Sequence, residues 1–522
     1  MYPGLYAEKS PDKPAVVLHP AGARIDYRTL EARSRQFARV LRERGLRPGD
    51  TVAILAENHV GYLEVYWAAI RSGLYLTAVN WHLTAPEAAY LLNDSAARVL
   101  VTTARFTDLA REVAALSPTC ATVFLLDGAA GGFESYGDAA AAQSDAPLPD
   151  QPAGEVMLYS SGTTGRPKGI RRPLSGLQVD EPGRISAARM GKALLGIGED
   201  SVYLTPAPLY HAAGLQWAAA AHELGATLVI LERFDAEQLM AVIERERVTH
   251  VQVVPTMMVR LLKLTADVRA RYDLSSLRSL VHAAAPCPPA VKRQMISWLG
   301  PIVDEYYSST EGSGMTFIRA ADWLEHPGSV GRPTVGTPHI CADDGSELPV
   351  GEPGLLYFDR GDALFEYHND PDKTREGRHP AHPTWTTSGD MGYLDADGYL
   401  YLTDRKSFTI ISGGVNIYPA EIEAALISHP AVADVAVFGL PHDEMGEYVH
   451  AVLQPADGVE PTPELAEQLL AFAGEQLARF KVPRAITFRG ELPRMPTGKL
   501  AKTALRQEFL AAPGDALLPS QR

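Results

Sequence analysis

The residues best suited to chemistry form a short polar stretch between Met157 and Ile170, where the sequence reads MLYSSGTTGRPKGI. The residues EVMLYSS at its start predict a strand that leads directly into it. Glycine lets the backbone come close to a ligand, and successive N–H groups with hydroxyl side chains suit phosphate oxygens. The stretch predicts a phosphate-binding loop made of Ser160, Ser161, Gly162, Thr163, Thr164, Gly165 and the cation Lys168.

Two other interpretations of this loop fit less well. Gly162 and Lys168 have the spacing of a Walker A loop. That motif, however, requires glycine where Pro167 stands and a hydroxyl residue where Gly169 stands. A flexible linker would need neither the strand before the loop nor the Pro-Lys-Gly ending. A phosphate loop of another kind is therefore the better hypothesis.

Four further motifs follow in order along the chain. They are YYSSTEG (Tyr306–Gly312), TSGDMGYLDADGYLYLTDR (Thr387–Arg405), ISGGVNIYPAEIE (Ile411–Glu423) and PRMPTGKLAK (Pro493–Lys502). Together with the loop they resemble the signatures of the adenylate-forming superfamily. This superfamily includes acyl-CoA and aryl-CoA synthetases, peptide-synthetase adenylation domains and firefly-type luciferases. The resemblance covers nearly the whole chain and is closest in appearance to bacterial acyl-CoA synthetases.

The resemblance implies an ATP-dependent acyl-CoA synthetase. A hydrophobic carboxylic acid and ATP would give acyl-AMP and pyrophosphate, and CoA would then give acyl-CoA and AMP. Two like charges about 4 Å apart repel by roughly 4 kcal/mol at an effective dielectric near 20. The carboxylate can therefore attack the α-phosphorus only beside well-placed positive charge.

Two alternative functions stay open. An adenylation enzyme that loads an acyl group onto a carrier protein has the same motifs, and its carrier would act in trans because no Asp-Ser-Leu phosphopantetheine site follows the last motif. A noncatalytic nucleotide-binding protein on the same scaffold is the second alternative. It is disfavoured because four residues with expected roles in the reaction are all retained: Lys168, Glu311, Asp390 and Lys499.

The phosphates and the metal would be held by the second and last motifs. The resemblance implies that Thr310 donates to the α-phosphate and that Glu311 binds Mg²⁺, a cation that prefers oxygen ligands. Ser309 is expected to contact the cofactor beside them. Lys499 would be the mobile cation that reaches the substrate carboxylate and the α-phosphate. Lys502 is expected to be an exposed lysine of the following helix.

The nucleoside would be held by residues from three places in the sequence. The resemblance implies that Tyr307 lies against adenine and that Asp390 accepts from the ribose hydroxyls with the help of Arg405. A turn residue is the alternative role for Asp390. The run VHAAAPCP takes the place of the adenine loop, and its expected contacts are Ala284, Ala285 and Pro286.

The thiol step would depend on rotation of a small C-terminal domain. The resemblance implies that Gly413 and Gly414 line the path of a pantetheine arm. The superfamily usually carries Asp or Lys at the pivot, where this chain has Ser407. A hinge needs only to absorb a backbone rotation, so serine is compatible with it. Phe480 is expected either to stack on the CoA adenine or to lie in the core.

The acid pocket would be lined by PAPLYHAAGL (Pro206–Leu215) and VQVVPTMMVRLL (Val251–Leu262). His211 resembles the residue that often lines this pocket. Members that activate amino acids carry an aspartate nearby, and the sequence Ala-Ala-Gly after His211 contains none. Met257 and Met258 indicate an adaptable apolar cavity, and a helix face that packs in the core is the alternative. The expected substrate is a hydrophobic monocarboxylic acid, whether fatty, aryl or alicyclic.

The elements that position these motifs alternate between strands and helices up to about residue 255, which predicts largely parallel α/β sheets. Residues 328–404 are rich in glycine and proline and predict a β-rich subdomain. The rest of the chain predicts a compact α+β unit. The expected fold is α/β, with a large N-terminal domain (1–405) and a small mobile domain (406–522) that rotates on a hinge near 405–407.

Composition limits the class of protein. The chain has 522 residues, a formal net charge of −15 and three cysteines. Such an acidic chain is a poor candidate for nonspecific nucleic-acid binding. No secretory signal, long apolar run or cysteine framework is evident, which favours a reducing cytoplasm. A homodimer is compatible with these features.

Overall fold

The computed structural model describes residues 2–160, 167–181, 187–362, 365–405, 408–412, 415–442, 444–494 and 500–511. The chain divides into two compact units, each built from segments that are distant in the sequence. The first unit consists of Met1–Ser160, Pro167–His282 and Leu364–Arg375, and the second of Ser161–Arg166, Ala283–Ala363 and Glu376–Arg522.

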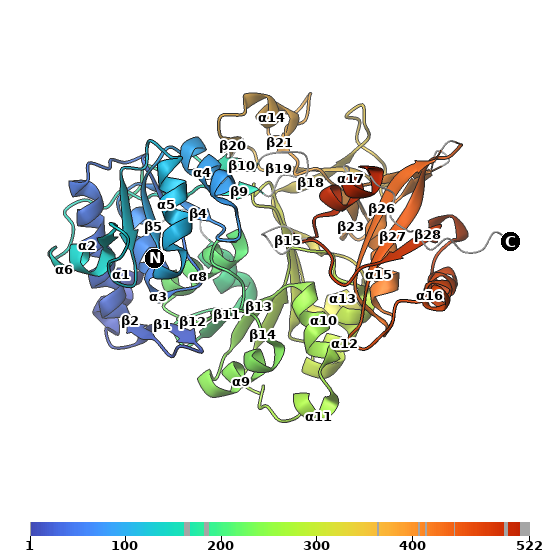
Figure 1. The fold of residues 1–522 in the computed structure, drawn as a ribbon, viewed down its shortest axis with the longest axis horizontal. Coiled ribbons are helices and arrows are strands. Elements are labelled where there is room, and N and C mark those ends of the chain that lie inside the picture. Colours follow the sequence, from blue (N-terminus) through green and yellow to red (C-terminus); the bar gives the residue numbers. More distant parts are fainter. Residues whose placement is uncertain are drawn as a thin grey trace. The chain divides into compact units, whose positions relative to one another are not determined.

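A six-stranded parallel sheet lies in the first unit, with the strand order β7-β6-β5-β3-β4-β8. Strands β3 and β4 are buried at every residue, as expected for parallel strands covered on both faces. Helices α4 (Ala85–Asp94) and α5 (Thr107–Ala115) pack on one face (Figure 1). The strands are β3 Thr51–Leu55, β4 Tyr75–Val79, β5 Ala97–Thr102, β6 Thr122–Leu125, β7 Glu134–Ser135 and β8 Glu155–Val156.

A second sheet of the first unit has the strand order β14-β13-β11-β12-β1-β2, and only its β1–β2 pair is antiparallel. Helix α3 (Val60–Ile70) contacts β4 of the first sheet and β1 of the second, and its residues from Gly61 to Ile70 are all buried because both sides are covered. Helix α8 (Ala212–Glu223) packs on β11 and β12. The strands are β1 Pro14–His19, β2 Arg24–Asp26, β11 Val202–Thr205, β12 Thr227–Leu231, β13 His250–Val253 and β14 Ser279–His282.

A small antiparallel sheet completes the first unit. It consists of β9 (Leu158–Ser160), β10 (Lys168–Arg171) and β20 (Glu366–Tyr367), with β10 in the middle. The predicted phosphate loop therefore connects two neighbouring strands of one sheet. The remaining helices of both units include α1 Pro3–Lys9, α2 Tyr27–Glu43, α6 Tyr136–Ala141, α7 Ala187–Met190, α9 Ala236–Glu246, α10 Pro255–Lys263, α11 Ala266–Arg269, α12 Pro289–Leu299, α13 Ala320–Glu325 and α14 Pro371–Glu376.

Antiparallel strands dominate the second unit before residue 406. Strand β16 pairs with β15 on one side and with β17 on the other. Strand β19 pairs with β18, β21 and β22, and β22 pairs with β23. The bounds are β15 Val303–Ser308, β16 Met315–Ile318, β17 Arg332–Val335, β18 Thr337–Cys341, β19 Gly354–Asp359, β21 Trp385–Thr386, β22 Asp390–Leu394 and β23 Leu400–Arg405.

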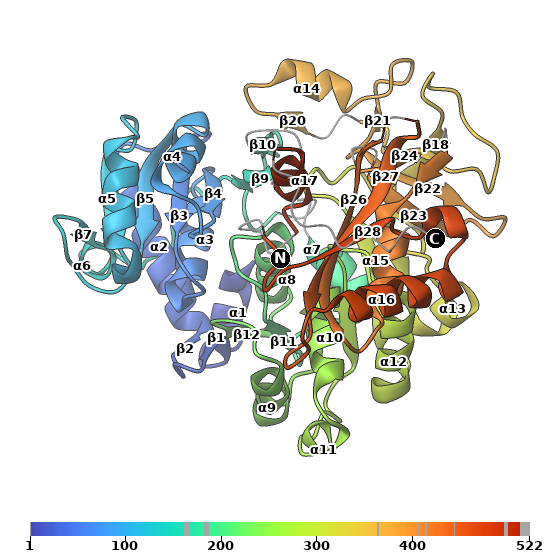
Figure 2. The same cartoon turned by 45° about the vertical axis from the view of Figure 1, so that its right-hand side comes forward.

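The end of the chain folds as a five-stranded sheet with helices on both faces (Figure 2). Side chains alternate along β26: Val435 and Val437 pack with α15 and α16, whereas Ala436 and Phe438 pack with α17. This alternation follows from the two-residue period of a strand. The elements are β24 Ile410–Ser412, β25 Val415–Ile417, α15 Pro419–Ile427, β26 Val432–His442, β27 Gly446–Pro455, α16 Pro463–Gln476, β28 Ala485–Phe488 and α17 Lys502–Ala511.

These observations confirm the predicted fold class, with α/β sheets, a β-rich part and a small C-terminal α+β fold. The segment 128–152, which is rich in glycine and alanine, contains β7 and α6 and buries Tyr136 and Leu148. The domain boundary near Arg405 stays a prediction. No helix within the described residues has the length and apolar character needed to span a membrane.

Candidate functional site

The phosphate loop begins and ends on the paired strands β9 and β10. Lys168 lies opposite Ser160 and Gly169 lies opposite Tyr159. A Cβ on Gly169 would come within 2.6 Å of Met157 Cε and 3.0 Å of Tyr159 Cζ, so glycine lets these two side chains pack against the backbone there. The predicted contacts Ser161, Gly162, Thr163, Thr164 and Gly165 lie outside the described residues, and so does the side chain of Ser160.

Lys168 itself is partly buried at the start of β10. Its side chain is 21% exposed, and its Nζ lies 3.6 Å from Asp370 Oδ2. The ammonium also lies 5.7 Å from the centre of the Tyr367 ring. The only lysine of the predicted loop is therefore held by two residues, Tyr367 and Asp370, that lie about 200 positions further along the chain.

The second motif forms the end of β15 and a tight turn. Gly312 N donates to Ser309 O at 3.0 Å, and Gly312 has a φ of +69°, a conformation that favours glycine. Arg360, the residue after β19, donates its Nη1 to Gly312 O at 2.8 Å and stabilises the turn. The turn presents Thr310 and Glu311 on a rigid frame.

The chemistry of this turn fits phosphate and magnesium. Glu311 is 8% exposed, and a carboxylate held at so buried a position is a good ligand for a hard cation. Among the described residues, the buried Oγ atoms of Ser309 and Ser313 have no hydrogen-bond partner. Buried hydroxyl groups normally have one. The donor set therefore fits a ligand with several oxygen acceptors.

Asp390 connects the second motif to the third. Its Oδ2 accepts from Tyr307 Oη at 2.6 Å and from Ser388 Oγ at 2.8 Å. Asp390 also pairs with Arg405 across the β22–β23 ladder. The structure thus brings together Tyr307, Asp390 and the backbone of Arg405, and their roles at the nucleoside stay predictions. The side chain of Arg405 lies outside the described residues.

The predicted adenine loop follows β14 and has an unusual backbone. Ala284 has a φ of +74°, a conformation that few non-glycine residues adopt. Ala284, Ala285 and Pro286 are all exposed. Strained backbone of this kind clusters at binding sites, and small exposed side chains leave room for contact with a flat base.

His211 lies just before α8 and at the end of a row of rings. Its ring centre is 4.4 Å from that of Tyr210, which lies 6.5 Å from His82, and His82 stacks on Trp81 at 3.5 Å. Burial and the charge of Arg105 lower the pKa of His82. Tyr210 belongs to the run Pro206–Leu215 that was expected to line the acid pocket, whereas Trp81 and His82 were not predicted from the sequence.

A positional signal supports Tyr210 and could have indicated Trp81 and His82. Trp81 and His82 follow the carboxyl end of β4, and Tyr210 follows that of β11. Ligands of open parallel sheets bind at the carboxyl ends of the strands. On α10, by contrast, Met258 is fully buried and serves the core.

Lys499, predicted for the adenylation step, lies outside the described residues. The same holds for Gly413, Gly414 and Ser407, which were predicted for the thiol step. Next to the glycine pair, Ile411 and Val415 are 56% and 45% exposed. Phe480 is 53% exposed, so the alternative of a core role is wrong.

Lys502 differs from its expected role as an exposed helix lysine. Its side chain is only 11% exposed, and its Nζ lies 2.7 Å from Glu423 Oε1. Burial raises the pKa of Glu423 to about 7, against the opposing effect of Lys502. Lys502 therefore ties α17 to α15.

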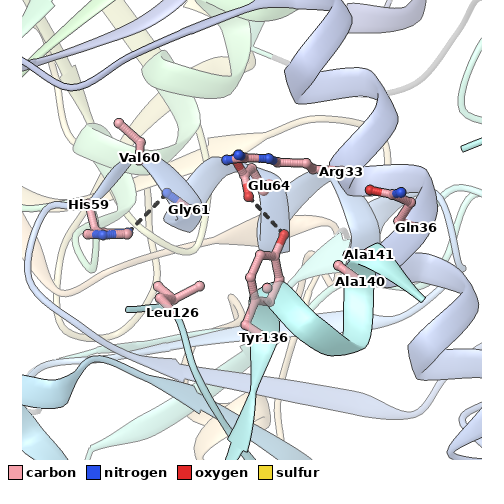
Figure 3. Close-up of a pocket in the computed structure, with 11 residues that line it drawn as sticks. Arg33, Gln36, His59, Val60, Gly61, Glu64, Leu126, Tyr136, Ala140 and Ala141 are labelled. Carbon is pink, nitrogen blue, oxygen red and sulfur yellow. Dashed lines mark hydrogen bonds and ion pairs between the residues drawn. The ribbon is translucent and has the colours of Figure 1, made fainter. Parts of the chain in front are cut away.

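Two other groups resemble sites and have structural explanations. A cavity of about 350 Å³ lies between α2, α3 and α6 (Figure 3). Its buried Glu64 accepts from Tyr136 and pairs with Arg33, each at 2.9 Å, so its polar groups satisfy one another. Asp395 and its neighbour Asp397 approach His326. Asp395 caps its own turn through the N–H groups of Asp397 and Tyr399, which accounts for its position.

Comparison with known proteins identifies the family. The sequence model of the AMP-binding enzyme family matches residues 5–366. The sequence model of the AMP-binding enzyme C-terminal domain matches residues 421–499. The chain belongs to the AMP-binding enzyme family. The predicted resemblance to adenylate-forming enzymes is thereby confirmed.

Individual relatives of this AMP-binding enzyme align over almost its full length. It is 33% identical to the fatty acid–[acyl-carrier-protein] ligase ScoC of Streptomyces coeruleorubidus, covering 97% of this chain and 95% of that protein. It is 34% identical to feruloyl-CoA synthase of an Amycolatopsis species, covering 97% and 98%. The structure of ATP-bound MatB from Rhodopseudomonas palustris superimposes with a TM-score of 0.81 at 30% identity, covering 98% and 99%.

Proposed function

We propose that this AMP-binding enzyme is an ATP-dependent acyl-CoA synthetase of the cytoplasm. It would join a hydrophobic carboxylic acid to AMP with release of pyrophosphate and then transfer the acyl group to CoA. One observation carries the proposal: Asp390 accepts hydrogen bonds from two hydroxyl groups, and one of these belongs to the motif that contains buried Glu311.

The residues of the second unit would each act on one part of the nucleotide. The carboxylate of Asp390, oriented by Tyr307 and Ser388, would accept from the ribose hydroxyls. Thr310 would donate to the α-phosphate from the fixed turn. Glu311 would hold Mg²⁺, which when bound neutralises phosphate charge as a Lewis acid. The exposed Ala284 loop would contact adenine.

The cations would reduce the repulsion between the acid and the triphosphate. Lys168 would hold phosphate oxygens from the first unit, and Lys499 would approach the carboxylate and the α-phosphate from a small mobile domain (406–522). Placed positive charge is the main means of catalysing such transfers. Rotation of the small domain about the hinge near 405–407 would then withdraw Lys499 and open the path for the thiol.

The acid is proposed to be a hydrophobic monocarboxylate. The rings of Trp81, Tyr210 and His211 support an aromatic or apolar pocket wall, and the names of two relatives refer to fatty acids and to ferulate. A carrier-protein thiol is the second candidate acceptor. It is favoured by the similarity to a ligase named for the acyl carrier protein.

An acid panel tests the proposal directly. The purified protein with ATP and Mg²⁺ should release pyrophosphate with one class of fatty, aryl or alicyclic acid, and should then form a thioester with CoA. Thioester formation with a phosphopantetheinylated carrier but not with CoA would select the second candidate. Absence of pyrophosphate release with every acid would refute both.

A further inference from the structure

We propose that Asp370, together with Tyr367, positions the ammonium of Lys168 for the phosphates of ATP. The inference rests on the proposed function and adds to it a residue outside all five sequence motifs. Lys168 would be the phosphate-contacting group, and Asp370 a positioning residue that acts through it.

Strand pairing brings the two residues together. Strand β20 pairs with β10, with Tyr367 opposite Ile170. His368 N donates to Gly169 O at 2.7 Å, which extends the contact to the residue beside Lys168. Asp370 follows two residues later, and its Oδ2 lies 3.6 Å from Lys168 Nζ. The segment after β20 therefore lies beside the start of β10, the strand that follows the phosphate loop.

Asp370 is itself held in place. Its Oδ1 accepts from Lys373 N at 2.9 Å, and its own N–H donates to Tyr367 O at 3.1 Å. The preceding Asn369 has a φ of +55° and donates its amide to Asp94 Oδ1 at 3.1 Å. The carboxylate that faces Lys168 is thus fixed at both ends of its turn.

Asp94 also holds β9, the strand that leads into the loop. Asp94 Oδ2 accepts from Tyr159 Oη at 2.7 Å, and Tyr159 is on β9. Asp94 therefore connects the strand that enters the loop with the segment that contacts the strand leaving it. The position of Lys168 is determined by this frame and not by the loop alone.

The physical advantage concerns the flexible lysine side chain. A lysine has four rotatable carbon–carbon bonds and loses much rotamer freedom when it binds a ligand. An ion pair and the face of the Tyr367 ring restrict the ammonium before ATP arrives. An ammonium has three donor hydrogens, so one carboxylate does not exhaust its capacity for phosphate oxygens. The expected contribution is pre-organisation of ATP binding.

Asp370→Asn removes the negative charge of Asp370 and keeps the size of the side chain. Asparagine keeps the acceptor for Lys373 N, so the turn should persist. The matched control is Asp372→Asn in helix α14, which begins just after Asp370. Asp372 pairs with Arg375 at 2.9 Å, and its side chain is 80% exposed. Acid-dependent pyrophosphate release is measured against ATP concentration, with thermal midpoints recorded for each variant.

The expected result is a rise in KM for ATP of about threefold to fivefold in Asp370→Asn, the range of a partly exposed ion pair, with kcat nearly unchanged. Asp372→Asn should match the wild type. Lys168→Met should raise KM further, and adding Asp370→Asn to it should have no additional effect.

Two outcomes would overturn the positioning role while the proposed function stands. One is an unchanged KM in Asp370→Asn, and the other is an equal rise in KM with and without Lys168, which would indicate general damage to the sheet. An unchanged KM in Lys168→Met would refute the phosphate role of Lys168 itself. Failure of the wild type to release pyrophosphate would refute the proposed function and this inference with it.

Discussion

The carboxylate of Asp390 offers the sharpest test of the nucleotide site. Its Oδ2 already accepts from Tyr307 and Ser388 at 2.6 and 2.8 Å, so its orientation is set before a ligand binds. Asp390→Ala removes the acceptor and leaves two hydroxyl groups that are both only half-buried. Water can satisfy those hydroxyl groups, so the fold should tolerate the change and the loss should appear in ATP binding.

The size of the effect follows from the number of lost hydrogen bonds. A hydrogen bond to a charged acceptor contributes about 1.5–3 kcal/mol. Loss of one such bond to a ribose hydroxyl should raise KM for ATP about tenfold to a hundredfold, at 1.36 kcal/mol per tenfold change. Tyr307→Phe keeps the ring and the carboxylate but removes one orienting donor. It should raise KM by less, about twofold to tenfold.

Steady-state pyrophosphate release at saturating acid measures these constants. The matched control is Asp397→Ala, because Asp397 is an exposed aspartate in the next turn of the same motif. Its variant should keep the wild-type KM. An unchanged KM in Asp390→Ala, or an equal rise in Asp390→Ala and Asp397→Ala, would remove Asp390 from the ribose site.

Four further predictions concern the second half-reaction, the metal, backbone strain and acid stability. Lys499→Ala should lose most adenylation in single-turnover assays yet form thioester from preformed acyl-AMP; an equal loss of both steps would contradict domain rotation. Glu311→Gln should raise the Mg²⁺ concentration needed for half-maximal pyrophosphate release, and an unchanged requirement would exclude Glu311 as a metal ligand. Ala284→Val should destabilise the fold by roughly 1–2 kcal/mol, since a β-branched residue is strained at a φ of +74°, whereas Ala284→Gly should not; denaturant unfolding measures both. Burial lowers the pKa of His450 from 6.5 to about 4, so the unfolded chain binds a proton first as the pH falls. Stability should therefore drop by up to roughly 3 kcal/mol between pH 6.5 and 4, and His450→Gln should show a weaker pH dependence in unfolding experiments.

Much of the fold could be predicted because its elements have simple periodic patterns. The apolar runs of β3 and β5 and the longer helical pattern of α4 were evident from the sequence. Strand β4 was missed: its residues YLTAV include a threonine that becomes fully buried inside the sheet. The burial of Tyr136 within a segment rich in glycine and alanine was missed for a related reason, since tertiary packing overrode the local composition.

The candidate site was predictable only where residues that act on the same part of the ligand are neighbours in the sequence. Thr310 and Glu311 share one motif, and the turn that presents them follows from Gly312. Asp370 could not be found in this way. Its contact with Lys168 depends on the pairing of β20 with β10, and a two-residue strand has almost no signal of its own. Lys502 was misjudged because nothing local indicates the distant Glu423 that draws it inward.

By itself, then, the sequence determined which chemical groups are present and the order in which they occur. The reason is that five short motifs with special residue types can be recognised from the local sequence alone. The tertiary structure decided which of those groups meet, as in the hydrogen bond from Tyr307 to Asp390 across 83 positions. The physical reason is that a hydrogen bond or ion pair depends on distance in space. Only the pairing of strands and the packing of helices bring side chains so distant in the chain within 3 or 4 Å of each other.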